Sequence, residues 1–225
     1  MEGVMTKVPA LQKTIQLGII LGCFMLPLNA FSATLNSSVK DSSGKPVKDA
    51  VVYANPLNFT PASSERLQNV IMDEIGTEFV PYVLPVQTGT PVHFPNKDNI
   101  SHNVYSISPA KKFELPLYKG TPAPPVVFDK PGPVVLGCSI HDLMIAYIYV
   151  VETPYFAKTG EDGSAEIANL PAGQYEVLVW HPLLMGPPES IGKHIDLSKQ
   201  DKASVDFVIN MMQAWRPPRN QIYRY

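Results

Sequence analysis

Short runs of β-branched and aromatic residues, separated by turn-forming residues, are the feature that most constrains the fold of this chain. Val, Ile, Tyr, Phe and Thr favour extended strands, whereas Gly, Pro, Asn and Asp between the runs favour turns. The 23 prolines are about a tenth of the 225 residues, against a usual share of about 5%. Because proline disrupts helix interiors, the pattern predicts an all-β protein.

The expected strands are 34–39, 50–54, 78–86, 91–94, 102–107, 126–128, 133–138, 145–151, 165–168, 174–180 and 203–209. Only residues 63–73 predict a short helix, because Leu67, Val70 and Ile71 recur at helical spacing. This number of short strands favours one or two β-sandwiches.

Residues 1–33 have the features of a signal peptide. Lys7 and Lys13 precede an apolar stretch at 15–31, and small residues lie around its end. A single membrane anchor is one alternative, but Pro27 and Asn29 interrupt the apolar run. A lipoprotein site at Cys23 is the other, but the apolar run continues directly after this cysteine. We therefore expect cleavage, export to the periplasm and no membrane span in the mature chain.

Cleavage after residue 33 would leave Cys138 as the only cysteine. A chain with one cysteine has no internal disulfide, and an exposed thiol in an oxidising compartment tends to oxidise or cross-link. Burial or a metal bond would protect it. His141 and Met144, three and six residues further on, favour the metal bond.

Four residues form a set of candidate metal ligands. Cys138, His141 and Met144 lie in one predicted loop between two apolar strands, and His102 opens a strand after the turn at 96–99. One thiolate, two imidazoles and one thioether are the ligands of a blue, electron-transfer copper site, whereas carboxylates suit harder ions. We expect these donors, from two separate stretches, to meet at one centre.

The flanking residues resemble those of cupredoxins of the plastocyanin and amicyanin type. The matching stretches are Phe-Pro-Asn at 94–96, Ser-His-Asn-Val at 101–104, Phe-Asp-Lys-Pro-Gly at 128–132 and Cys138-x2-His141-x2-Met144. The resemblance covers residues 67–152 and implies a Greek-key sandwich with one type 1 copper, bound by His102, Cys138 and His141 with a weak axial Met144. It also implies that Asn103 hydrogen-bonds to the cysteine loop and holds Cys138 in place.

The rest of the chain resembles a second β domain. Residues 43–53 and 159–177 are similar to the two parts of a carboxypeptidase-regulatory-like, or prealbumin-like, sandwich. We therefore expect this outer domain at 34–66 and 153–210, with the cupredoxin inserted at 67–152 and a basic aromatic tail at 211–225. One cupredoxin with irregular extensions is the alternative. The whole arrangement resembles bacterial exported proteins of the methylamine utilisation type, a label that names no substrate.

Charge and motifs exclude several functions. The net charge of −2 does not indicate nucleic-acid binding. The five histidines form none of the His-x-His pairs that multicopper oxidases need, and no serine lies in a nucleophile elbow. We expect a non-enzymatic electron carrier that meets a redox partner protein, a dehydrogenase or a cytochrome, with His141 as the electron port. A copper trafficking or storage protein, and a binding module with a degenerate copper site, are the alternatives.

Overall fold

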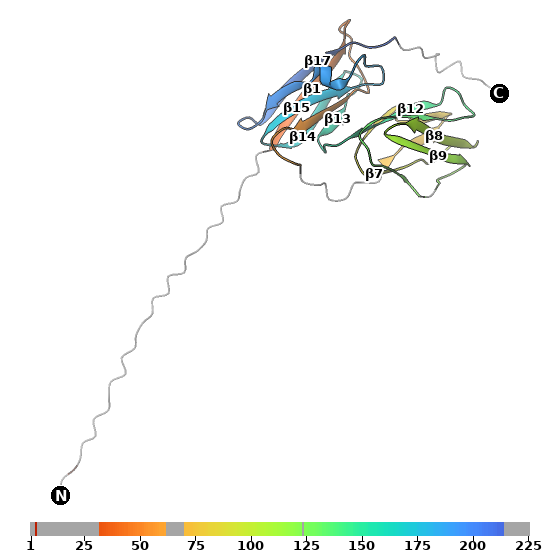
Figure 1. Ribbon diagram of the computed structural model, residues 1–225, viewed down its shortest axis with the longest axis horizontal. Helices are drawn as coiled ribbons and strands as arrows, with labels where there is room; N and C mark the ends of the chain where they lie inside the picture. Colours follow the sequence, from red (N-terminus) through yellow and green to blue (C-terminus); the bar gives the residue numbers. More distant parts are fainter. Residues whose placement is uncertain (1–2, 4–31, 62–69, 123, 214–225) are drawn as a thin grey trace. The chain divides into compact units, whose positions relative to one another are not determined.

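The described residues form β-strands and one short 3-10 helix, η1 (Pro188–Ile191) (Figure 1). The computed structural model describes residues 3, 32–61, 70–122 and 124–213. The predicted all-β class is confirmed for these residues. None of them belongs to a helix that has the length and hydrophobicity to cross a membrane.

One group of strands forms a sandwich of a three-stranded sheet, β14-β1-β17, and a four-stranded sheet, β13-β2-β15-β16. Their bounds are β1 (Ser32–Asp41), β2 (Val51–Pro56), β13 (Phe156–Lys158), β14 (Ser164–Pro171), β15 (Gln174–Trp180), β16 (Lys193–Asp196) and β17 (Lys202–Ile209). Alternate residues of β1, such as Leu35 and Val39, are buried against Val177 and Val179 of the facing sheet. The period of two follows from the pleat of the strand.

The other strands form a second sandwich, of a five-stranded sheet, β6-β12-β11-β8-β9, and a three-stranded sheet, β10-β7-β3. Their bounds are β3 (Val70–Ile71), β6 (Val83–Gln87), β7 (Thr90–His93), β8 (His102–Ser108), β9 (Lys111–Tyr118), β10 (Val126–Phe128), β11 (Gly132–Gly137) and β12 (Ile145–Val151). A separate hairpin joins β4 (Asp73–Ile75) to β5 (Glu78–Val80). Phe94, Phe128, Leu136 and Ile148 are at the centre of this core.

All strands of the second sandwich come between β2 and β13 of the first sandwich along the chain. In space, the two cores are joined by a third cluster of buried side chains. Tyr149 of β12 stacks on Trp180 of β15 with ring centroids 4.3 Å apart and an interplanar angle of 8°. The hydroxyls of Tyr149 and Tyr53 are 3.0 Å apart, at hydrogen-bond distance. The likeness of the first sandwich to prealbumin-like domains stays a prediction.

Strand pairing positions the predicted ligand loop. β11 pairs antiparallel with both β12 and β8, and Gly137 lies opposite Ile145 on one side and Tyr105 on the other. In antiparallel pairs the end of one strand lies beside the start of its neighbour. The end of β11 and the starts of β8 and β12 are therefore at the same end of the sheet.

The predicted helix at 63–73 is wrong where the structure describes it, while residues 63–69 lie outside the described part. Val70 and Ile71 form β3, which pairs in parallel with β7. The backbone N–H of Met72 donates to the carbonyl of His93 at 2.9 Å, and its side chain is fully buried. Sheet pairing and burial outweigh the local helical spacing.

The strand predictions differ from the structure at other places too, and β13 and β16 were not among the expected strands. The single strand expected at 78–86 is divided into β5 and β6, with a break at Pro81 and Tyr82. Strand β9 was not expected, because Lys111, Lys112 and Pro116 are poor strand formers. Lysine and proline are tolerated there because β9 is at the edge of its sheet.

The Trp180→Ala substitution should lower the free energy of unfolding by about 3–5 kcal/mol. The Trp180 side chain is 8% exposed and belongs to the cluster that joins the two cores, so its removal leaves a cavity. Urea denaturation followed by circular dichroism measures the change. The matched control is Val208→Ala on the surface, 67% exposed, with an expected effect within about 0.5 kcal/mol. A Trp180→Ala effect as small as that of the control would contradict the prediction.

Candidate metal centre

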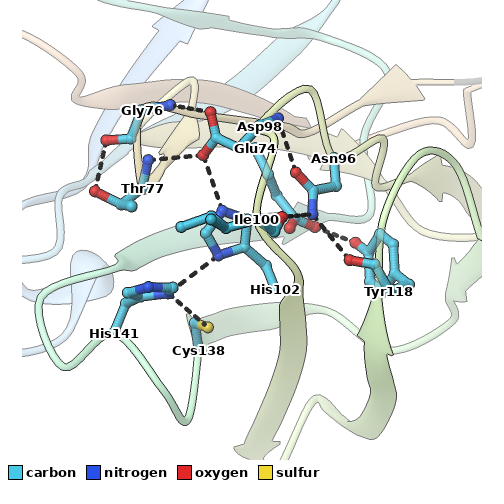
Figure 2. Close-up of polar contacts among 10 residues, drawn as sticks. All are labelled: Glu74, Gly76, Thr77, Asn96, Asp98, Ile100, His102, Tyr118, Cys138 and His141. Carbon is cyan, nitrogen blue, oxygen red and sulfur yellow. Dashed lines mark hydrogen bonds and ion pairs between the residues drawn. The ribbon is translucent and has the colours of Figure 1, made fainter.

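Three of the four predicted donors lie together at the shared end of β8, β11 and β12 (Figure 2). One donor atom each from His102, Cys138 and His141 lies within 4.8 Å of the other two. The Nδ1 atoms of His102 and His141 are 3.1 Å apart, and Nδ1 of His141 is 3.7 Å from Sγ of Cys138. A thiol and two imidazoles thus converge from two stretches of the chain.

These separations fit a single bound metal ion. Using zinc as a guide, imidazole nitrogen binds such ions at about 2.0 Å and thiolate sulfur at about 2.3 Å. Two donors at those bond lengths around one ion lie roughly 3–4 Å apart when the angle between the bonds is about 100–120°. The two measured distances fall in this range, so little rearrangement is needed to bind an ion.

Burial differs among the predicted ligands. His102 is completely buried, and Cys138 and Met144 are 5% and 1% exposed, whereas His141 is half-buried on the loop after β11. Met144 belongs to the same core cluster as Cys138, and its backbone N–H donates to the carbonyl of His141 at 2.9 Å. The loop is therefore closed by its own hydrogen bond, with Met144 in the core.

Asn103 connects β8 to the cysteine loop. Its Oδ1 accepts hydrogen bonds from the backbone N–H of Ser139 at 2.7 Å and from the Ser139 hydroxyl at 3.0 Å. Ser139 directly follows Cys138, so the bond limits movement of the thiol relative to His102. This is the contact that the cupredoxin resemblance implies for Asn103.

Asp98 was missed by the sequence analysis. Its Oδ2 lies 2.8 Å from Nε2 of His102, and the backbone N–H groups of Gly76 and Thr77 donate to its two oxygens at 2.7 and 2.9 Å (Figure 2). Burial alone would raise the pKa of Asp98, but the hydrogen bonds from Thr77, Gly76 and His102 hold that pKa below its usual 3.8. The only signal in the sequence was an acidic residue four positions before His102.

The environment of His141 favours its neutral form. Partial burial lowers the pKa of His141 below its usual 6.5, and the nearby His102 lowers it further, while Asp98 acts weakly in the opposite direction. A neutral imidazole has a free lone pair for a metal ion. At neutral pH, His141 therefore does not have to lose a proton before it binds a metal ion.

A buried carboxyl group lies close to the site. Glu74 is completely buried, and the Tyr118 hydroxyl donates to its Oε1. Within the part of the chain that the structure describes, Oε2 of Glu74 has no hydrogen-bond partner. Burial raises the pKa of Glu74 to about 7, because an ionised carboxylate is poorly solvated there.

Several solved structures are similar to part of this chain. A copper-containing nitrite reductase from Thermus scotoductus SA-01 matches 44% of this chain at 28% identity, with a TM-score of 0.36, and only 26% of the reductase chain is spanned. A purple cupredoxin from Nitrosopumilus maritimus matches 37% of this chain and 98% of its own length at 24% identity, with a TM-score of 0.32. A reduced amicyanin variant matches 44% of this chain and 99% of its own length at 20% identity, with a TM-score of 0.34. No family model and no curated protein matches the chain.

The Glu74→Gln substitution should stabilise the metal-free protein above pH 7 and have little effect near pH 4. The folded-state pKa of about 7 lies above the unfolded value near 4.5, so the folded state binds the extra proton. The contribution of Glu74 to the free energy of unfolding therefore falls as pH rises from about 4.5 to 7, by about 3 kcal/mol at most. Glutamine is neutral at every pH and still accepts the Tyr118 hydrogen bond, so the variant avoids this loss.

Urea denaturation of both proteins from pH 4 to pH 8 gives the comparison. The matched control is Glu114→Gln on the exposed side of β9, which should leave the pH dependence unchanged. A constant difference between wild type and Glu74→Gln across this range would contradict the prediction.

Proposed function

We propose that this protein binds one copper ion in a type 1 centre of a cupredoxin domain and acts as an electron carrier. The observation that carries the proposal is the convergence of Nδ1 of His102, Sγ of Cys138 and Nδ1 of His141. Met144 would be the weak axial ligand from the core. This set of ligands is typical of blue copper sites that transfer electrons.

The residues of the site are suited to fast electron transfer. Bound copper supplies the one-electron step between Cu(II) and Cu(I). His102 and Cys138 are held in the core, with Asp98 and Asn103 limiting their movement. Donors that stay in place when the charge changes keep the reorganisation small. Electron transfer needs no separate catalytic group, so the residues of this site are sufficient for a carrier.

The exposed side of the ligand loop is suited to docking. His141 is half-buried, and the apolar neighbours Ile140, Leu143 and Ile145 are 51%, 40% and 45% exposed. Exposed apolar groups beside a ligand favour contact with another protein. We assign this face to the redox partner, a dehydrogenase or a cytochrome, with His141 as the port through which the electron passes.

The proposed location is the periplasm. This rests on the signal-like residues 1–33, most of which lie outside the described part of the chain. The membership among exported proteins of the methylamine utilisation type rests likewise on sequence resemblance.

Purified protein loaded with Cu(II) should contain one copper per chain and show an intense visible charge-transfer band. Cys138→Ser should abolish the band, because the band requires the thiolate bond. Met144→Leu should keep the band but change the reduction potential, since the axial ligand tunes the potential. The matched control is Met185→Leu. The Met185 thioether is 58% exposed, so its removal should leave both the band and the reduction potential unchanged.

Absorption spectra, metal analysis and a redox titration of each variant measure the band, the copper content and the reduction potential. A wild-type protein without the band, or a band that persists in Cys138→Ser, would rule out the proposed centre. Bound copper that passes rapidly to a chelator would instead favour copper trafficking or storage.

A further inference from the structure

The hydrogen bonds around Asp98 determine which nitrogen of His102 carries a proton. A carboxylate accepts hydrogen bonds and donates none, so Nε2 of His102, 2.8 Å from Asp98 Oδ2, must carry the hydrogen. In the neutral imidazole, Nδ1 then has the free lone pair. That atom is the one that lies 3.1 Å from Nδ1 of His141 (Figure 2).

Asp98 is itself held by the turn between β4 and β5. Gly76 and Thr77 are the two turn residues, with φ of +62° and +58°, as in the type I′ turn that joins tight hairpins. Their backbone N–H groups donate to the two oxygens of Asp98 at 2.7 and 2.9 Å. Positive φ is unfavourable for a β-branched residue such as threonine. The turn keeps a strained conformation that directs both donors at the carboxylate.

The loop that contains Asp98 is fixed from its other side by Asn96. Oδ1 of Asn96 accepts the backbone N–H of Asp98 at 2.9 Å, and its amide donates to the carbonyls of Ile100 and Tyr118, both at 2.9 Å. Asn96 is 5% exposed. The carboxylate therefore has a defined position between a hairpin distant in sequence and the ring of His102.

We propose that Asp98, anchored by the Gly76-Thr77 turn, is a positioning residue that fixes the orientation and tautomer of His102 and stabilises Cu(II) over Cu(I) at the site. The preference for Cu(II) over Cu(I) rests on the proposed function. A histidine that donates its second N–H to a carboxylate is a more basic ligand, and a more basic ligand favours the more highly charged ion. The orientation and tautomer of His102 concern the metal-free protein and do not depend on copper.

Asp98→Asn is the informative substitution. In the wild type, two carboxylate oxygens accept hydrogen bonds from three donors, which are the N–H groups of Gly76 and Thr77 and Nε2 of His102. Asparagine offers only one oxygen and an NH2 group. At least one donor must lose its partner. The charge-matched control is Asp129→Asn, which removes an exposed carboxylate that pairs with Lys111.

The first measurement is the tautomer of His102 in the metal-free protein, by nitrogen-15 NMR of the imidazole rings. Wild type and Asp129→Asn should show a single form protonated at Nε2, and Asp98→Asn should show a mixture with the Nδ1 form. Thr77→Gly keeps the backbone donor and relieves the positive φ, so it should behave as wild type. A wild-type His102 protonated at Nδ1 would overturn the proposal even if Asp98→Asn does not fold.

The second measurement is the reduction potential of the copper-loaded proteins. Asp98→Asn should lower the affinity for Cu(II) relative to Cu(I) roughly tenfold, within the 10–100-fold range of such partners, which raises the potential by about 59 mV. A shift in potential without a change of tautomer, or a change of tautomer without a shift, would overturn the proposal. If wild type forms no blue centre, the proposed function fails while the NMR result still decides the role of Asp98 toward His102.

Discussion

The pairing of β8 with β11 is the interaction on which the candidate site depends. It brings the start of β8, with His102, beside the end of β11, where the chain enters the Cys138 loop. Gly137 permits this pairing, because a Cβ at that position would lie 2.9 Å from the Tyr105 ring across the pair. The Asn103–Ser139 hydrogen bond continues the contact beyond the last paired residues. Two stretches that are far apart in sequence are thus held at a fixed distance by ordinary sheet hydrogen bonds.

Local sequence was sufficient to predict the ligand loop but not the residues that hold its ligands in place. Cys138, His141 and Met144 are close in sequence between two apolar runs, so their common loop follows from spacing. His102 was included because its imidazole completes the donor set of a copper site, and Asn103 was included through the resemblance, because no local pattern connects either residue to residue 138. Asp98 was missed because its anchor is the turn at Gly76 and Thr77, whose relation to residue 98 exists only in the folded chain. The helix expected at 63–73 failed at Val70 and Ile71 for the same reason, since their partner is β7.

The β4–β5 hairpin combines two destabilising features with the donors that hold Asp98. It carries Glu74, a buried carboxyl with one unsatisfied oxygen in the described structure, and Thr77, a β-branched residue with positive φ. Both features cost stability, the second by about 1–3 kcal/mol. The same hairpin supplies the two N–H groups that hold Asp98. A turn of different backbone geometry would direct these donors elsewhere, so the conformation of the turn, and not the threonine side chain, is tied to the position of the carboxylate.

The direction of β12 separates the candidate site from the contact between the two cores. Ile145 starts the strand beside Gly137 at the site, whereas Tyr149 and Val151, further along, are in the cluster that contains Trp180. Tyr149 and Val151 thus pack against the first sandwich while Ile145 stays 45% exposed. Among His102, Cys138, Met144 and His141, only His141 is more than 5% exposed. Among the described residues, the face of the 138–144 loop therefore gives access to the donors, and the first sandwich contacts β12 without covering this face.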